Sequence, residues 1–146
     1  MEVEDEIRTA LLAMSAVTAL VGTGDSARIR SYELAAIDNR EEEHIIIEVD
    51  SKPRENTIDG DGAMVMAQVN LSCRAPTRKR ADGLAAAVKT NGTSRGTGLA
   101  WYGGSGTAFD SWLEDETPSK IRWGDNSKRL WHTVEQSYVV QFPESV

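Results

Sequence analysis

The hydrophobic positions near the start of the chain recur every three or four residues. Between residues 4 and 21 the repeating apolar side chains are Ile7, Leu11, Met14, Val17 and Val21. This spacing places them on one side of an α-helix, so the pattern predicts a helix over 4–21 that ends at Gly22. Residues 23–43 combine turn-forming residues with an acidic run, and only 28–32 looks strand-like. We expect that stretch to be mostly loop.

Two segments in the middle of the chain alternate between apolar and polar positions. Residues 44–50 read HIIIEVD, and residues 63–74 read AMVMAQVNLSCR. Alternation with a period of two predicts two half-buried β-strands. Residues 51–62 between them contain a proline and two Asp-Gly steps, which are typical of turns. The two strands should therefore form a hairpin.

A second amphipathic segment begins after Pro76. Thr77 is a suitable N-cap, Asn91-Gly92 is a suitable end, and the apolar stripe between them is Ala81, Leu84, Ala85 and Val88. A helix is expected there, followed by a flexible glycine-rich loop over 91–107. Residues 109–115 and 130–142 alternate again and predict two more strands, with Pro118 as an interruption.

The order helix-β-β-helix-β-β predicts an α+β fold with an antiparallel sheet of about four strands and two helices packed on one face. A length of 146 residues is typical of one domain, so we expect a single domain over 1–146.

Charge is distributed unevenly and is negative overall, at −7. Residues 1–50 carry 12 acidic and 4 basic side chains, whereas residues 51–100 carry 4 acidic and 8 basic ones. Tight binding of duplex DNA requires a dominant basic surface, which this composition disfavours. An acidic wall would still let DNA pass through a channel without adhering to it.

Several protein classes lack support in the sequence. No apolar run approaches the ~20 residues that span a bilayer, and the acidic start does not resemble a secretory signal. The single cysteine, Cys73, can form neither an internal disulfide nor a cysteine zinc site. We expect no membrane contact, no cofactor and no metal, and a reducing compartment.

Candidate catalytic residues each have a simpler interpretation. His44 and His132 lack metal-ligand spacing and are expected at the surface of strand edges. Cys73 falls on the apolar side of a strand, where a buried thiol is inert. Asp59-Gly-Asp61-Gly lacks the other ligands of a calcium loop and indicates a turn. No nucleophile motif such as GxSxG is present, so we expect no enzyme activity.

Two groups of residues are candidate interface residues. Trp101 and Tyr102 lie in the glycine-rich loop, where exposed aromatic side chains favour a binding partner. The alternative is that this pair folds back over its own sheet. Arg78, Lys79 and Arg80 open the second helix and suggest a subunit contact, with a solvated face or phosphate contact as alternatives.

The order of elements and several segments resemble the phage tail-completion or tail-terminator family. These segments are AVTALVG at the end of the first helix, HIIIEVD, AQVNLSCRAPTRKRADGLAAAVK and LWHTVEQSYVVQF. The chain departs from the family pattern in its glycine-rich insert at 91–107 and its acidic stretch at Glu41 to Glu43. Both departures are expected to alter partner contacts.

The resemblance implies a structural virion protein that assembles in the host cytoplasm as a ring, typically a hexamer, at the head-proximal end of the tail. Its partners would be copies of itself, the tail tube protein and a head-tail connector or neck protein, with DNA only passing through the lumen. Two alternatives are a neck connector or stopper ring bound to the head, and a small ligand-binding or enzymatic module with the 91–107 loop as a lid.

Overall fold

The computed structural model describes residues 3–24, 27–31, 43–49, 54–55, 64–92, 98–103, 109–122 and 130–143. Within these residues the elements are α1 (Val3–Leu12), α2 (Ser15–Val21), β1 (Ile29–Ser31), β2 (His44–Val49), β3 (Arg54–Glu55), β4 (Met64–Ala75), α3 (Arg78–Thr90), β5 (Trp101–Tyr102), β6 (Asp110–Arg122) and β7 (Leu130–Pro143). The Asp59–Gly62 turn and most of the 91–107 loop lie outside the described residues.

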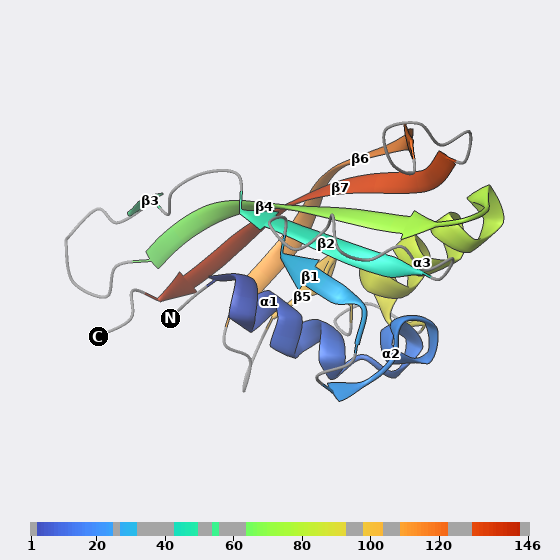
Figure 1. The fold of residues 1–146 in the computed structure, drawn as a ribbon. Helices are drawn as coiled ribbons and strands as arrows, with labels where there is room; N and C mark the ends of the chain where they lie inside the picture. Colours follow the sequence, from blue (N-terminus) through green and yellow to red (C-terminus); the bar gives the residue numbers. More distant parts are fainter. Residues whose placement is uncertain are drawn as a thin grey trace.

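The strands form one mixed sheet in the order β1-β2-β4-β7-β6-β5, and β3 pairs with β4 beside this path (Figure 1). β1 runs parallel to β2, and the other neighbours are antiparallel. The predicted α+β class is confirmed, and β2, β4, β6 and β7 correspond to the four predicted strands. The prediction of an antiparallel sheet of about four strands with two helices matches the structure only roughly, because the described part of the chain adds one parallel strand, two two-residue strands and a third helix.

The predicted helix over 4–21 is broken into two helices at Met14. Met14 has an extended backbone (φ −92°, ψ 110°), yet its side chain is buried and keeps the apolar spacing intact. The side-chain oxygen of Asn91 accepts a hydrogen bond of 3.1 Å from the backbone N–H of Ala16, which caps α2. Asn91 also ends α3 in the left-handed conformation (φ 53°). The start of α2 is thus capped by a residue 75 positions away in the sequence, which periodicity cannot reveal.

β6 continues through Pro118, contrary to the predicted interruption. Pro118 lies opposite Val134 of β7, whereas β5 pairs only with Ser111 and Trp112 of β6. Beyond Trp112, β6 is therefore an edge among the described strands. A proline is tolerated on an edge strand because its missing N–H removes no ladder hydrogen bond on the free side.

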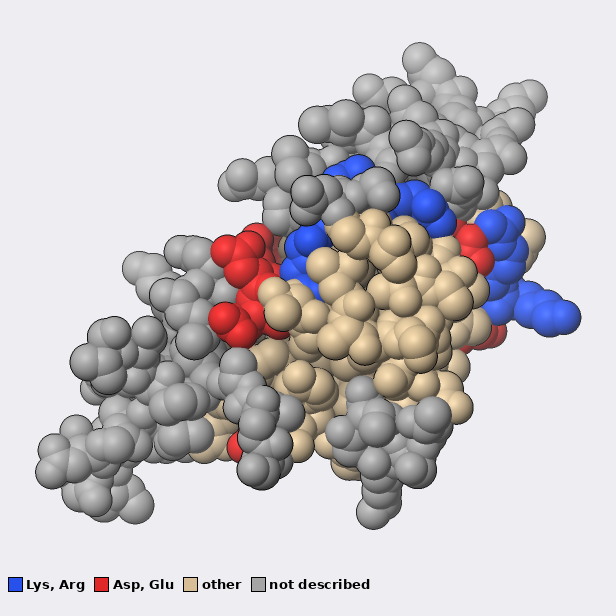
Figure 2. Space-filling model, turned by 90° about the horizontal axis from the view of Figure 1, so that it is seen from below, with Lys and Arg blue, Asp and Glu red and all other residues tan. Residues whose placement is uncertain are grey.

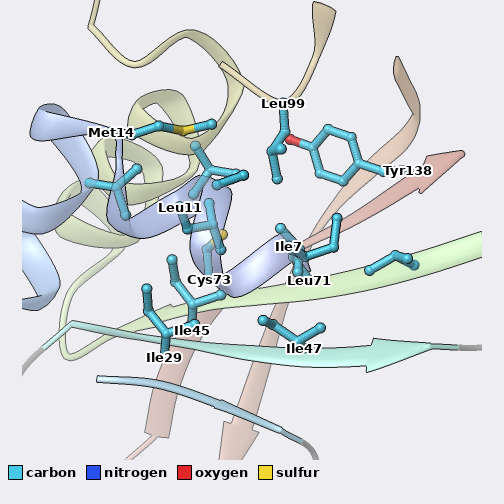
Figure 3. Packing of buried hydrophobic residues seen from close by; sticks show 14 of the residues in the cluster. Ile7, Leu11, Met14, Ile29, Ile45, Ile47, Leu71, Cys73, Leu99 and Tyr138 are labelled. Atoms are coloured by element: carbon cyan, nitrogen blue, oxygen red, sulfur yellow. The ribbon is translucent and has the colours of Figure 1, made fainter. Parts of the chain in front are cut away.

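One hydrophobic cluster joins the helices to the apolar side of the sheet (Figure 3). In the view of Figure 1, α1 and α2 lie below the sheet, and α3 packs against β4 and β7. Buried side chains of the cluster include Ile7, Leu11, Val17, Ile45, Ile47, Leu71, Cys73, Leu84, Val88 and Tyr138.

Cys73 is fully buried as predicted, and burial together with the charges of Glu135 and Glu116 raises the pKa of its thiol. The thiol stays protonated and unreactive.

A buried amide, Gln136, lies beside this cluster. Its nitrogen donates to the carbonyl oxygen of Ala85 at 3.2 Å and to Oε2 of Glu116 at 2.8 Å. Its oxygen accepts from the hydroxyl of Tyr138 at 3.0 Å and from the Cys73 thiol at 3.7 Å. All four hydrogen-bonding positions of the amide are occupied. Gln136 therefore ties α3, β4, β6 and β7 together.

The face of the sheet turned away from the helices, called the polar face below, carries hydrogen-bonded polar side chains. The bonds join Ser72 to Glu135, Arg74 to Ser72, and Ser137 to Asn70.

The two histidines are less exposed than expected. His44 is buried, with 2% of its surface exposed, and His132 is half-buried. Their predicted places on exposed strand edges are wrong, because β2 and β7 are interior strands with a neighbour on each side.

Candidate functional site

The segment that leads into β5 is fastened to the end of α3. The N–H groups of Leu99 and Ala100 donate to the carbonyl oxygens of Val88 and Lys89, at 2.8 and 3.2 Å. These two carbonyl oxygens belong to the last turn of α3, where carbonyl groups find no N–H donor within the helix itself. Within 91–107 the described residues contain only the two-residue strand β5, and the flexibility of this loop stays a prediction.

Pairing of β5 with β6 places Trp101 directly opposite Trp112, and Tyr102 opposite Ser111. Ser111 donates to the carbonyl oxygen of Leu99 at 2.7 Å, and the Tyr102 ring stacks on Phe109 with centroids 4.7 Å apart. Tyr102 and Ser111 therefore face the helices. Because side chains alternate along a strand, the two tryptophans point to the polar face.

The tryptophans are the large hydrophobic side chains that the described residues leave exposed, at 48% for Trp101 and 40% for Trp112. Cross-strand neighbours have Cβ atoms about 5 Å apart, so the two indoles form one patch. Trp112 also lies opposite the half-buried Val139. We call Trp101, Trp112 and Val139 the aromatic patch.

The sequence identified only part of this patch. Trp101 is exposed as predicted for an interface residue, whereas Tyr102 packs back on its own fold, which was the alternative. Trp112 was missed, although the alternation of 109–115 already set it on the polar side with Asp110 and Glu114. Those two carboxylates are exposed beside it on β6. Along β6 the aromatic patch is therefore flanked by Asp110 on one side and by Glu114, at the irregularity after Leu113, on the other.

The three basic residues at the start of α3 have different environments. Thr77 caps the helix by accepting from the N–H of Arg80. Arg78 forms an exposed ion pair with Asp82, with 3.0 Å between nitrogen and oxygen, and Lys79 is exposed. Arg80 instead binds the largely buried carboxylate of Glu43. Arg78 and Lys79 stay candidate interface residues, whereas Arg80 holds the fold together.

Glu43, together with Arg28 and Arg80, connects α2, the start of β2 and α3. Arg28 donates from Nε to the carbonyl oxygen of Glu43 and from Nη2 to that of Leu20, both at 2.8 Å. Burial raises the pKa of Glu43, but the hydrogen bond from Arg80 and the charges of Arg80 and Arg28 outweigh this, so its pKa lies below 4.5. The expectation that Glu41 to Glu43 alters partner contacts is not supported at Glu43, which is engaged internally; Glu41 and Glu42 lie outside the described residues.

We predict that Glu43→Gln makes the free energy of unfolding depend less on pH between pH 7 and pH 3. A carboxylate with a lowered native pKa stabilises the fold above its unfolded pKa, and this stabilisation disappears as the pH falls through the native value. The variant should therefore be less stable than the wild type near pH 7 and about equal to it near pH 3. Urea denaturation at both pH values measures this. Asp82→Asn, in an exposed pair, is the control with little effect at either pH, and an equal loss for Glu43→Gln at both would contradict the prediction.

The outer surface of α1 and α2 carries no charge over a long stretch. Residues 9–24 contain no acidic or basic side chain, in a chain whose residues are 27% charged. The side chains of this stretch that reach the surface include Thr9, Leu12, Ala13, Ser15, Ala19 and Leu20, and we call these six the uncharged helix face. Figure 2 shows an uncharged area on this side of the molecule, bordered by both acidic and basic side chains, with a prominent acidic group at its left and a prominent basic group at its right.

The described residues hold no group of three or more histidine, cysteine or carboxylate side chains able to bind a metal ion. None of the described helices combines the length and apolar character needed to cross a membrane. The distinctive features of the described surface are the aromatic patch and the uncharged helix face, and exposed aromatic side chains and depletion of charge are both features of contact surfaces between proteins.

Comparison with known structures finds a similar fold in a solved virion particle. A chain of the virion of a native gene transfer agent particle matches 97% of this chain and 94% of its own length, with 15% identity and a TM-score of 0.58. At this identity the likeness shows the fold alone. A search of curated proteins gave no match.

The sequence then identifies the family. The family described as Tail completion protein gp17 matches residues 5–91, more than half of the chain. The protein belongs to this family of phage tail completion proteins and is a structural component of the virion tail. The resemblance inferred from the sequence is confirmed.

Proposed function

We propose that this protein is a tail terminator: a ring of six copies at the head-proximal end of the tail tube that stops tube polymerisation and offers the joining surface for the head. The observation that carries the proposal is the family match over residues 5–91. A component that completes a tail must bind the last layer of the tube without offering that layer's surface again. Growth then stops and joining can begin.

The surface of the chain supports assembly by contact. Exposed tryptophans are common at the centres of protein interfaces, and depletion of charge is typical of interface cores. The aromatic patch and the uncharged helix face are different surfaces, so one copy can bind the next head to tail and close a ring. Partners of the ring would be the tail tube protein on one side and a connector or neck protein on the other.

We further propose that the protein makes and breaks no covalent bond. Its buried thiol is held protonated, and its function needs only complementary surfaces. DNA would pass through the lumen without sequence-specific contact, as the net charge of −7 favours.

Deletion of the gene from its phage tests the proposal. We expect tails of uncontrolled length that fail to join heads, and restoration of both properties when the wild-type chain is supplied in trans. Tails of normal length with unjoined heads would instead indicate a neck connector. Normal tails joined to heads would overturn the proposal.

A further inference from the structure

The aromatic patch and the uncharged helix face lie on opposite sides of the fold. Trp101 and Trp112 extend from the polar face of the sheet, because their neighbours Tyr102 and Ser111 face the helices. The uncharged helix face lies on the outside of α1 and α2, below the sheet in Figure 1. Two different patches on opposite sides of one subunit suit a head-to-tail contact, in which one patch binds an unlike patch on the next copy.

Charged residues of opposite sign lie near the two surfaces. Acidic residues lie beside the aromatic patch, and basic residues lie on part of the border of the uncharged helix face. Asp110 and Glu114 are exposed on β6 next to Trp112. Arg78 and Lys79 are exposed at the start of α3, and Figure 2 shows a basic group on the right border of the uncharged area. Complementary charges of this kind fix the register of a contact and speed its formation.

We propose that a second copy of this chain covers the aromatic patch with its uncharged helix face, so that Asp110 and Glu114 of one copy approach Arg78 and Lys79 of the next. This assignment rests on the proposed ring and specifies the contact that builds it. The indoles supply the apolar area, and the charge-free helices accept it without burying an unpaired ion.

Strand pairing through the free edge of β6 is the main alternative contact between copies. That edge carries several features that oppose strand addition: an irregularity between Leu113 and Asp115, Pro118 within the strand, and the exposed charge of Lys120. Natural sheets protect their edges from pairing with such bulges, prolines and lysines. Side-chain contact by the aromatic patch is therefore favoured over extension of the sheet.

A mixing experiment with two complementary variants tests the contact. Trp101→Ser/Trp112→Ser destroys only the aromatic patch, and Ser15→Glu/Ala19→Glu destroys only the uncharged helix face. All four positions are exposed, and circular dichroism and thermal melting check that both variants fold. Each variant alone should be monomeric by sedimentation and should fail to cap tail tubes. An equal mixture should form a one-to-one heterodimer and no larger species, because one intact copy of each surface remains.

Two further variants keep the experiment decisive. Thr117→Glu, an exposed change on β6 away from the patch, should assemble like the wild type. Lys79→Glu should weaken self-association by about tenfold or more, and Glu114→Lys in the same chain should restore it. Folded variants that still form rings, or a mixture that stays monomeric, would overturn this contact and leave the ring standing. A wild type that is monomeric both in solution and with tail tubes would overturn the ring itself.

Discussion

Gly98→Ala is expected to destabilise the protein by about 3 kcal/mol. A Cβ atom at this position would overlap the backbone carbonyl of Lys89 and the peptide nitrogen of Thr90. Backbone atoms at a helix end cannot move aside as a flexible side chain can. The segment would have to withdraw from α3, which breaks the hydrogen bonds from Leu99 and Ala100 and loosens the strand that holds Trp101.

Gly83→Ala is the matched control for this substitution. Gly83 lies in α3 with no atom within 4 Å of the added Cβ, so alanine should stabilise the helix by roughly 0.5–1 kcal/mol. Urea unfolding of the two variants and the wild type measures both changes. If both alanines shifted the midpoint in the same direction, the close approach of residue 98 to α3 would be refuted.

Gln136→Leu is expected to lower the free energy of unfolding by about 3 kcal/mol, although leucine is apolar and similar in size to glutamine. The change removes the acceptor of the Tyr138 hydroxyl and, at the same time, one donor to the Ala85 carbonyl and one to Oε2 of Glu116. Buried polar groups that lose their partners are penalised by about 1–3 kcal/mol each, offset in part by the better burial of leucine. The loss should appear in the free energy of unfolding.

Gln68→Leu makes the same chemical change on the half-buried polar face of β4. It should alter stability by less than about 1 kcal/mol, because no buried partner depends on this side chain among the described hydrogen bonds. Tyr138→Phe should lie between the two, since it removes only the donor of one bond to Gln136. Equal effects of the two glutamine substitutions would show that the buried network contributes nothing.

The long elements of the fold could be predicted from the sequence, because each buries one face. The alternation of 44–50, 63–74 and 130–142 reports directly which residues face the helices, and the structure contains β2, β4 and β7 at these places. β3 and β5 have two residues each, too few for any period to appear. The break between α1 and α2 was hidden because Leu11, Met14 and Val17 stay on one side across it.

The candidate site was predictable only where exposure follows from the chain's own pattern. The alternation around Phe109 could have identified Trp112, but its meeting with Trp101 depends on the pairing of β5 with β6. The basic run 78–80 looked uniform in sequence. Its division into the exposed Arg78 and Lys79 and the internally paired Arg80 depends on Glu43, 37 residues away. Contacts between distant segments leave no periodic signal in either one.

Cryo-electron microscopy of purified tail tubes incubated with this protein tests the central claim most directly. The account predicts a six-fold ring of this chain on one end of each tube, the end that meets the head, and no elongation of capped tubes when tube protein is added. Bare tube ends, copies bound along the tube wall, or continued growth of occupied ends would contradict it.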